Sequence, residues 1–465
     1  MRHLLGEMSV ISPSFVTAAT LAPLFVAVLL AVIARRARLS RGARVRDPRR
    51  TVLHLALGAI LGGAAGLLLG WLFSDVLVVL GFGLTTVTKA WTAVGMMELG
   101  AAVVVIVRSR RSITGIGGRA APAPGLRVLH RSLGVALVPL AVFSGAVGIN
   151  SDVEEYPNVA AAFGLIRVSP LDVATVPAPT ASTAGAATDL PVEGSWTAEA
   201  AQPQRGRTGS VSIPGTQSAF RARDAIVYLP PAALMPDAPA LPVIVALAGQ
   251  PGEPLDLLKS ARIDRILDEY AAAHQGLAPI VVIPDQLGAP AANPMCVDSP
   301  LGNSASYLTE DVPTWIRQNL RVLPGPAHWA VAGFSQGGTC AAQLGTARPD
   351  VFGALLDISG EIGPHAARAK IDTAFGGDRD AYKAAFPASI MAAKAPYSDS
   401  AAYFCVGDQD QKFRPHAEAL DAAAREAGID SHLHLSERSA HDWRTVRNCV
   451  QSVLPVLSQR LGVTG

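Results

Sequence analysis

Five consecutive residues, Gly333-Phe334-Ser335-Gln336-Gly337, form a G-x-S-x-G motif. The motif follows the apolar run 329–332 and precedes a stretch with helical character. At a tight turn from a strand into a helix, side chains at the flanking positions would collide, so glycine is needed there and the serine hydroxyl is exposed. The motif and its placement therefore predict that Ser335 is a nucleophile.

A nucleophilic serine needs a base, which in this type of site follows the serine along the chain on a loop after a later strand. The small-residue loop that carries His441 directly follows a predicted strand at 432–435. His432 and His434 lie within that strand, and His416 begins a predicted helix. We therefore expect His441 to be the base.

The loop Gly407-Asp408-Gln409-Asp410 follows another predicted strand at 402–406 and offers two candidate acids. A carboxylate at this point would hold the imidazole in the required tautomer and stabilise its charged form. We favour Asp410, because this loop normally presents its acid three residues after the glycine, and keep Asp408 as the alternative. An exposed, aspartate-rich turn without a catalytic role is the other interpretation of both residues.

Two backbone N–H groups are expected to stabilise the negative charge that develops on a substrate oxygen. The first is that of Gln336, directly after the nucleophile, and the second comes from the loop after an early strand. That loop covers residues 247–252, where Pro251 has no N–H to offer. We therefore predict that Gln250 supplies the second donor.

The elements that would position these residues are short apolar strands that alternate with helices. Predicted strands lie at 243–247, 280–283, 329–332, 354–358, 402–406 and 432–435, and helices at 306–320, 339–347 and 415–427. Two earlier strands, at 209–213 and 221–229, are expected to form an antiparallel edge. This alternation predicts a mostly parallel sheet covered by helices over residues 205–465. Together with the G-x-S-x-G turn, it indicates the α/β-hydrolase fold.

Several segments of this region resemble the esterase D and antigen 85 group of α/β-hydrolases. They are Leu-Ala-Gly-Gln at 247–250, the helix entry at 307–313, Gly-Phe-Ser-Gln-Gly-Gly at 333–338, the segments 349–352 and 359–360, and His-Asp-Trp at 441–443. The resemblance implies hydrolysis of an ester, or acyl transfer in the manner of a mycolyltransferase, in the cell envelope. We expect an acyl-enzyme mechanism without a metal or organic cofactor, with a lipid ester as substrate. Hydrolysis of aminoacyl esters of membrane lipids is a further alternative, as is a non-catalytic envelope protein that keeps the fold.

The first 150 residues have a different composition. The chain of 465 residues is 50% hydrophobic and only 16% charged, and most of the apolar excess lies in this part. Apolar runs at about 14–34, 52–73, 91–107 and 133–149 are long enough, or nearly so, to cross a bilayer. The apolar stretch 76–88 is short and broken by glycine, so we interpret it as a re-entrant or interfacial connection, with a fifth span as the alternative. The sequence thus predicts a helical membrane domain with four spans, similar to the anchor of certain actinobacterial membrane esterases, whereas antigen 85 proteins are secreted without one.

Arginines between the spans give the orientation. They are Arg35, Arg36, Arg38, Arg41, Arg44, Arg46, Arg49 and Arg50 in one loop and Arg108, Arg110, Arg111, Arg119, Arg127 and Arg131 in another. The positive-inside rule places both loops in the cytoplasm, so everything after Ile149 would lie outside the cytoplasmic membrane. A cleaved signal peptide over residues 1–34 fits less well, because the charge follows the apolar run.

Four glycines of the second span recur at a spacing of four residues, which places them on one helix face: Gly58, Gly62, Gly66 and Gly70. Such a face allows two helix backbones to approach closely, although glycine is also simply common in membrane helices. On either interpretation their role is packing.

Glu98 lies near the middle of the third span, where an ionisable group is costly and is usually paired or functional. We expect a protonated, hydrogen-bonded carboxyl with His54, Thr85 or Thr86 as its partner.

Residues 151–204 are predicted to form an extracytoplasmic linker, because Pro, Ala, Ser and Thr dominate from about 169 to 203.

All four cysteines follow this linker, and an even number outside the cytoplasm indicates two disulfides with three possible pairings. Cys340 is expected on the helix after the nucleophile and Cys296 on the loop after the predicted strand 280–283, and we favour Cys296–Cys340 and Cys405–Cys449. Close C-x-x-C spacing is missing from the sequence, which argues against zinc.

Binding to nucleic acid is not expected, since the net charge is only +2 and the basic residues are not interleaved with aromatic ones. The segment 361–397 is expected to cover the substrate pocket as a cap.

Overall fold

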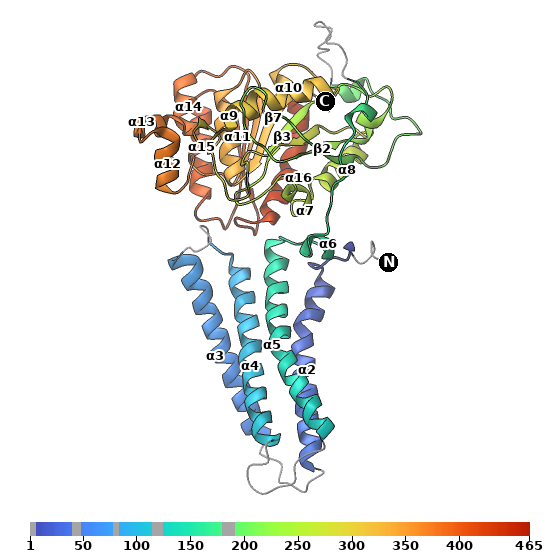
Figure 1. Cartoon of the computed structure of the whole chain (residues 1–465), viewed down its shortest axis with the longest axis vertical. Helices are drawn as coiled ribbons and strands as arrows, with labels where there is room; N and C mark the ends of the chain where they lie inside the picture. Colours follow the sequence, from blue (N-terminus) through green and yellow to red (C-terminus); the bar gives the residue numbers. More distant parts are fainter. Residues whose placement is uncertain (1–5, 40–47, 78–82, 114–123, 179–190) are drawn as a thin grey trace. The chain divides into compact units, whose positions relative to one another are not determined.

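A computed structural model of the chain describes residues 6–39, 48–77, 83–113, 124–178 and 191–465, and the chain divides into two compact units, Met1–Leu165 and Ile166–Gly465 (Figure 1). The division lies inside the predicted linker 151–204. Backbone hydrogen bonds join described parts of that linker to the second unit, such as Leu171 N to Ser210 O at 2.9 Å and Val192 N to Gly462 O at 3.0 Å. The second unit therefore begins before the predicted boundary at residue 205. Backbone pairing of this kind leaves no apolar periodicity in the sequence, which is why composition alone did not indicate it.

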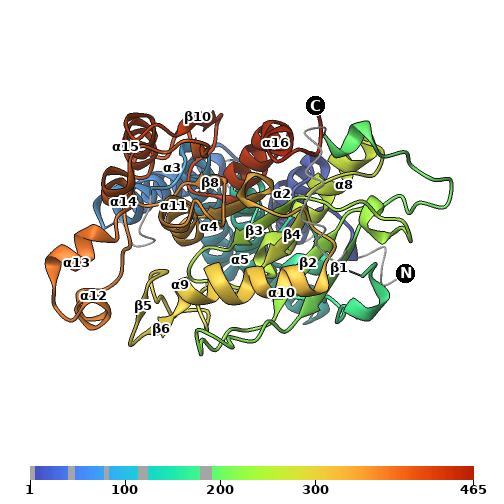
Figure 2. The ribbon, with the colours of Figure 1, turned by 90° about the horizontal axis from the view of Figure 1, so that it is seen from above.

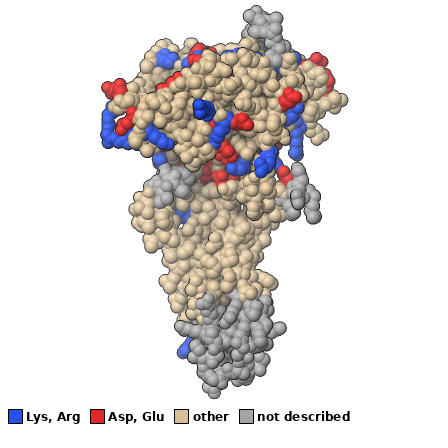
Figure 3. All heavy atoms as spheres, in the orientation of Figure 1, with Lys and Arg blue, Asp and Glu red and all other residues tan. Residues whose placement is uncertain are grey.

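The first unit contains the four predicted spans as helices. They are α2 (Pro13–Leu39), α3 (Pro48–Trp71), α4 (Thr86–Ile113) and α5 (Pro124–Val153), and a π-helical turn η1 (Leu72–Val76) continues α3. Each has a segment long and apolar enough to cross a membrane, by length and composition: 13–30, 52–76, 86–107 and 135–153. On the face drawn in Figure 3, charged side chains are sparse on the described surface of these helices and frequent on the second unit. Of the stretch predicted as a re-entrant connection, residues 78–82 lie outside the described residues, as do Arg41, Arg44, Arg46 and Arg119.

Glycine brings α3 and α4 into backbone contact. A Cβ atom at Gly62 would overlap with the backbone oxygen of Met96, and one at Gly100 with that of Gly58. At Gly66 the added atom would lie 2.7 Å from the Cα of Ala93. The packing role predicted for this helix face is therefore confirmed.

The expected partners of Glu98 are wrong. Ser144, on α5, donates its hydroxyl hydrogen to Glu98 Oε1 at 3.1 Å. His54 donates to the backbone oxygen of Arg50, and Thr85 donates to Asp152. The partner lies on α5, and the sequence does not reveal that α5 packs against α4. It does not lie on a segment that folds back onto α4.

The second unit is built on an eight-stranded sheet with the order β1-β2-β4-β3-β7-β8-β9-β10. Its strands are β1 (Arg207–Val211), β2 (Ala225–Leu229), β3 (Val243–Leu247), β4 (Ile280–Ile283), β7 (Trp329–Phe334), β8 (Ala354–Ile358), β9 (Ala401–Gly407) and β10 (Asp430–Ser436). The pairs β1–β2 and β2–β4 are antiparallel, and all other pairs are parallel. The predicted α/β fold and its antiparallel edge are confirmed.

Helices cover both faces of this sheet. The principal ones are α8 (Ile263–Ala273), α10 (Val312–Asn319), α11 (Gln336–Ala347), α15 (Arg414–Glu426) and α16 (Trp443–Arg460). In Figure 2, α8 and α16 lie on the opposite side of the central strands from α10. Because the parallel strands β3, β4, β7, β8, β9 and β10 run the same way, the loops after their carboxyl ends gather at one edge of the sheet, where sites of such folds lie.

The described residues also form shorter elements. They are α6 (Val159–Ala162), η2 (Val173–Thr175), η3 (Val192–Gly194), η4 (Pro231–Leu234), α7 (Asp256–Lys259), β5 (Asp298–Ser299), β6 (Gly302–Asn303), α9 (Ser304–Ser306), η5 (Tyr307–Asp311), η6 (Pro326–His328), α12 (Arg368–Phe375), α13 (Arg379–Ala384) and α14 (Pro387–Lys394). The last three helices occupy the segment predicted to form a cap.

Candidate active site

Ser335 lies at the sharp turn between β7 and α11, with φ 57° and ψ −118°. This conformation is sparsely populated for a residue with a side chain and persists only where the surroundings enforce it. The flanking glycines make the turn possible: a Cβ atom at Gly333 would overlap with the backbone oxygen of Gly337, and one at Gly337 with that of Leu247. The turn therefore requires glycine at both flanking positions, and Ser335 itself has neither helical nor strand backbone angles.

Three of the predicted residues meet in one hydrogen-bonded chain. His441 Nε2 lies 2.9 Å from Ser335 Oγ, and His441 Nδ1 lies 3.2 Å from Asp410 Oδ2. The side chains of His441 and Asp410 are only 6% and 2% exposed. With a proton on Nδ1, the imidazole donates to Asp410 and its Nε2 can accept the proton of the serine hydroxyl.

The two candidate acids have different surroundings. Asp410 accepts a second hydrogen bond from the N–H of Phe413 at 3.0 Å, so both of its oxygens are engaged. Asp408 instead accepts from the N–H of Ser439 at 3.2 Å, on the loop that leads to His441. Asp408 thus shapes the loop, while Asp410 contacts the imidazole.

Two aromatic rings pack against the imidazole of His441. The ring of Phe413 stacks on it with centroids 4.2 Å apart, and that of Phe334 lies at 5.0 Å. Asp442 caps α16 by accepting from Thr445 N at 2.8 Å. Its other oxygen accepts from Ala440 N at 2.9 Å, so the residues on both sides of His441 are fixed.

The predicted oxyanion donors lie on segments adjacent to Ser335. Gln336 is the first residue of α11, so its N–H has no acceptor within the helix and the helix N-terminus favours negative charge there. A Cβ atom at Gly249 would be 3.6 Å from the Cβ of Ser335, so the loop that carries Gln250 passes directly beside the serine. The donor role of the Gln250 N–H stays a prediction.

Two disulfides have the pairing favoured from the sequence, Cys296–Cys340 and Cys405–Cys449. The first ties α11, which follows Ser335, to the loop after β4. The second ties β9, which leads to the Asp410 loop, to α16, which follows His441. Each bond therefore braces an element next to a member of the hydrogen-bonded chain.

Sequence reasoning missed Gln286, which lies in the loop after β4 and is only 1% exposed. Its Nε2 donates to Ala248 O at 2.5 Å and to Gln336 Oε1 at 3.1 Å. The available signal was its position: it lies three residues after the predicted strand 280–283, at the edge where the other candidate residues gather.

Two carboxyl groups, one buried and one half-buried, lie beside the first turn of α11. Burial raises the pKa of Asp357, on β8, to about 7, and its Oδ1 accepts from Gly360 N at 2.8 Å. Burial also raises the pKa of Glu361, against the opposing effects of the nearby His365, Lys412 and His441. The N–H of Glu361 donates to Thr339 Oγ1 at 2.8 Å, which places it against the first turn of α11.

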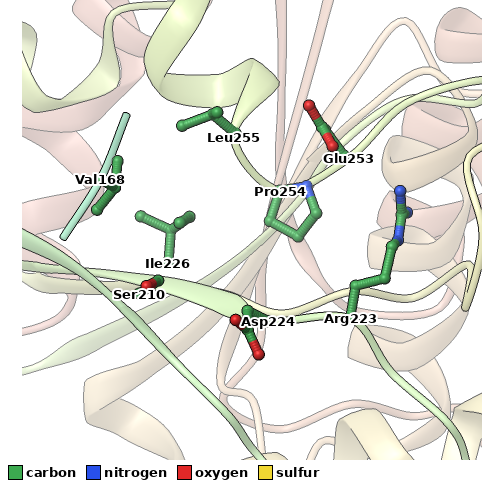
Figure 4. Close-up of a pocket in the computed structure, with 8 residues that line it drawn as sticks. All are labelled: Val168, Ser210, Arg223, Asp224, Ile226, Glu253, Pro254 and Leu255. Atoms are coloured by element: carbon green, nitrogen blue, oxygen red, sulfur yellow. The ribbon is translucent and has the colours of Figure 1, made fainter. Parts of the chain in front are cut away.

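A cavity of about 250 Å³ lies beside β1 and β2 (Figure 4). Ser210, Arg223, Ile226 and the segment 253–255 are among its lining residues, and none of its lining residues belongs to the hydrogen-bonded chain. Among the described residues, no group of three or more His, Cys, Asp or Glu side chains could hold a metal ion.

Comparison with known proteins identifies a family for about half of the chain. The protein-family model "Esterase" matches residues 216–448, about half of the chain. An uncharacterized protein of Corynebacterium glutamicum is 33% identical over 253 residues, which are 53% of this chain and 59% of that relative. This chain thus spans less than two thirds of the relative's length.

The solved structures that resemble part of this chain include three hydrolases. An S-formylglutathione hydrolase from Agrobacterium tumefaciens is 21% identical, with 56% of this chain and 97% of that chain covered and a TM-score of 0.47. A ferulic acid esterase is 18% identical, with coverage of 55% and 99% and a TM-score of 0.45. A fluorophosphonate-binding serine hydrolase of Staphylococcus aureus is 14% identical, with coverage of 55% and 99% and a TM-score of 0.45.

Proposed function

The chain belongs to the esterase family described by that model, and we propose that it cleaves acyl esters through a covalent acyl-enzyme on Ser335. The observation that carries this proposal is the chain of hydrogen bonds from Ser335 through His441 to Asp410. The strained, glycine-flanked conformation of Ser335 supports it further, because strain of this kind is stored at functional sites.

In the first half of the reaction, Ser335 Oγ attacks the ester carbonyl carbon while its proton passes to His441 Nε2. Asp410 stabilises the resulting imidazolium, and the N–H groups of Gln336 and Gln250 donate to the oxyanion. Collapse of the tetrahedral intermediate breaks the bond to the alcohol, which leaves with the proton from His441. In the second half, His441 takes a proton from water, the hydroxide attacks the acyl-enzyme, and the carboxylic acid leaves as Ser335 recovers its proton.

We further propose that the four apolar helices anchor the chain in the cytoplasmic membrane, with the catalytic unit outside. The arginine-rich loops support this orientation, and two disulfides in the catalytic unit are typical of an oxidising, extracytoplasmic compartment. The substrate we propose is a lipid-borne ester of the cell envelope, because one span already gives effectively irreversible insertion and four exceed what retention needs.

The nucleophile is tested with the full chain in detergent and a fluorophosphonate probe. We expect the unmodified chain to be labelled at Ser335, located by peptide mass spectrometry, and to hydrolyse a short-chain p-nitrophenyl ester. Ser335→Ala should lose both properties, while Ser452→Ala, an exposed serine of α16, should keep them. Labelling at another serine, or turnover that survives Ser335→Ala, would reject the proposed nucleophile.

The location is tested with reporter fusions. A periplasmic-type reporter should be active after Ile149 and inactive at Arg44, and a cytoplasmic reporter should give the reverse. Cytoplasmic activity of the fusion after Ile149 would contradict the proposed orientation. Lipid profiles of envelopes from cells that lack the protein or carry Ser335→Ala, each compared with cells that carry the unmodified chain, would then identify the ester. Product analysis with an added alcohol distinguishes hydrolysis from acyl transfer, since transfer would yield a new ester instead of a free acid.

A further inference from the structure

Gln286 joins the two segments that carry the proposed oxyanion donors. One hydrogen of its Nε2 group reaches Ala248 O, at the start of the segment 248–252, which we call the oxyanion loop. The same nitrogen lies 3.1 Å from Oε1 of Gln336, the residue after the nucleophile. An amide nitrogen has two hydrogens, so a single side chain can serve both acceptors at once.

The orientation of the Gln336 amide is fixed from its other side. Its Nε2 donates to Asn293 Oδ1 at 3.1 Å and lies 3.1 Å from the Sγ of Cys340, in the disulfide with Cys296. The Oε1 atom must therefore face Gln286, and exchanging the two amide atoms would break contacts at both ends. All of these side chains are buried, so water does not compete for the bonds.

The backbone beneath Gln286 is fixed by its neighbour Asp285, which is fully buried. Its carboxylate accepts from Arg223 Nη2 at 2.7 Å and Nε at 2.9 Å, and from the backbone N–H groups of Arg223, Leu287 and Gly288. Burial alone would raise the pKa of Asp285, but the hydrogen bonds from Arg223 and these backbone groups lower it below its usual value. The ion pair therefore persists at neutral pH and keeps the loop that carries Gln286 in place.

The same arginine holds the far end of the oxyanion loop. Arg223 Nη2 donates to Gly252 O at 2.9 Å, and Gly252 N donates to Pro290 O at 3.1 Å. Figure 4 shows Arg223 near Glu253 and Pro254, at the cavity that borders the residues after this loop. Hydrogen bonds from Gln286 and Arg223 therefore hold the oxyanion loop at both of its ends.

We propose that Gln286 is a positioning residue that holds the N–H groups of Gln250 and Gln336 in the arrangement that binds the oxyanion. This proposal rests on the proposed function, since it presumes Ser335 as nucleophile. Gln286 itself contacts no reacting atom. Loss of a single oxyanion donor costs about 10²–10³ in kcat, and a misplacement by about 1 Å can cost about 10²-fold. We call the hydrogen bonds from Gln286 to Ala248 and Gln336 the clamp. Removing the clamp should therefore lower kcat by roughly 10- to 100-fold and leave KM nearly unchanged.

The experiment compares Gln286→Met with Gln343→Met in the full chain in detergent. Both glutamines are buried, and Gln343 lies on α11 with its Nε2 donating to Ala385 O at 3.0 Å, away from the oxyanion loop. We measure kcat and KM on a short-chain ester and the inhibition constant of a trifluoromethyl ketone, whose adduct with serine carries an oxyanion. For Gln286→Met, kcat should fall by 10- to 100-fold and the inhibition constant should rise by a similar factor. For Gln343→Met, both values should stay near those of the unmodified chain.

A merely structural role would lower the melting temperature of both variants without changing either kinetic value, and that result overturns the clamp. A fall in kcat without weaker inhibitor binding overturns it as well. If Gln286→Met does not fold, Gln286→Asn keeps the amide but is one methylene shorter, and it should show the same two kinetic changes to a smaller extent. Absence of Ser335-dependent turnover in the unmodified chain would reject the proposed function together with the clamp, whereas normal turnover with an unaffected Gln286→Met rejects the clamp alone.

Discussion

Two helix backbones, those of α3 and α4, touch because Gly62 and Gly100 have no side chains. After the end of β7, α11 touches the end of β3 because Gly337 has no side chain either. The two units of the chain thus use glycine in the same way, for close approach of one backbone to another. The arrangement around each contact differs. The helix contact is repeated at four-residue intervals along a smooth surface, whereas the contact at the serine turn occurs once, within a backbone already forced to a positive φ at Ser335.

This difference determines how each region should respond to a change. Two helices can separate or slide by a few tenths of an ångström along the whole interface, because other glycines of the row still allow contact. The turn has no such freedom, since β3 and β7 are paired in the sheet and the first disulfide ties α11 to the loop after β4. An added methyl group should therefore reduce stability in the first unit and abolish chemistry in the second.

The largest effect is expected for Gly337→Ala. The new Cβ would overlap with the backbone oxygens of Leu247 and Ala248, which belong to β3 and to the oxyanion loop. We expect turnover of a short-chain ester and fluorophosphonate labelling to fall by at least about 10³-fold, because both the nucleophile and an oxyanion segment are displaced. Gly194→Ala is the matched control, since no atom lies within 4 Å of its added Cβ. Near-normal labelling of Gly337→Ala would show that the turn tolerates a side chain after all.

The next effect distinguishes the two aspartates on one loop. Asp410→Asn should lower kcat by about 10³- to 10⁴-fold, because an amide would favour the wrong imidazole tautomer. Asp408→Asn should keep most of the activity, since an amide oxygen can still accept from Ser439 N. Steady-state kinetics of both variants on the same ester provide the test. The reverse order of activities would reassign the acid to Asp408.

A smaller effect is expected at the helix contact. Gly62→Ala should lower the free energy of unfolding by about 1–3 kcal/mol through overpacking, without changing kcat on a soluble ester. Gly70→Ala, on the same helix, is the control, because its Cβ would lie 3.4 Å from the nearest atom, Lys89 Cγ. Thermal unfolding of the full chain in detergent, followed by helical signal, measures the difference. If Gly62→Ala lost activity on the ester in parallel with its loss of stability, the contact between α3 and α4 would affect catalysis as well as packing.

The sequence predicted those features that depend on local pattern. The G-x-S-x-G turn, the strands at 243–247, 280–283 and 354–358, and the row of glycines on α3 each follow from a spacing or a run of residue types. Features that depend on which elements become neighbours were missed. Glu98 pairs with Ser144 because α5 packs on α4, and Gln286 reaches both Ala248 and Gln336 because β4, β3 and β7 are adjacent in the sheet. Spacing along one segment carries no information about such neighbours.

The last expected effect depends on pH and concerns a buried carboxyl that crowds the serine turn. A Cβ atom at Gly338 would overlap with Asp357 Oδ1, so this aspartate is a further reason for glycine at that position. Its other oxygen, Oδ2, is buried without a hydrogen-bond partner among the described residues. An ionised carboxylate in such a place lacks the donors that would compensate for lost hydration, and burial accordingly raises its pKa to about 7.

A raised pKa makes the folded chain less stable as the pH increases. The unfolded carboxyl titrates near pH 3.9, so between about pH 4 and 7 the folded state binds the proton more tightly than the unfolded state, and stability falls as the pH rises through this window. The loss is of the order of a few kcal/mol. Asp357→Asn keeps an oxygen for Gly360 N but cannot ionise, so it should be more stable than the unmodified chain at pH 8 and lose this advantage near pH 4. Thermal unfolding from pH 4 to 8 measures the difference, with Asp237→Asn, at an exposed position, as control. Parallel stability curves for Asp357→Asn and the unmodified chain would mean that Asp357 does not change its charge between pH 4 and 8. Glycine at position 338 would then avoid only a steric conflict with Asp357.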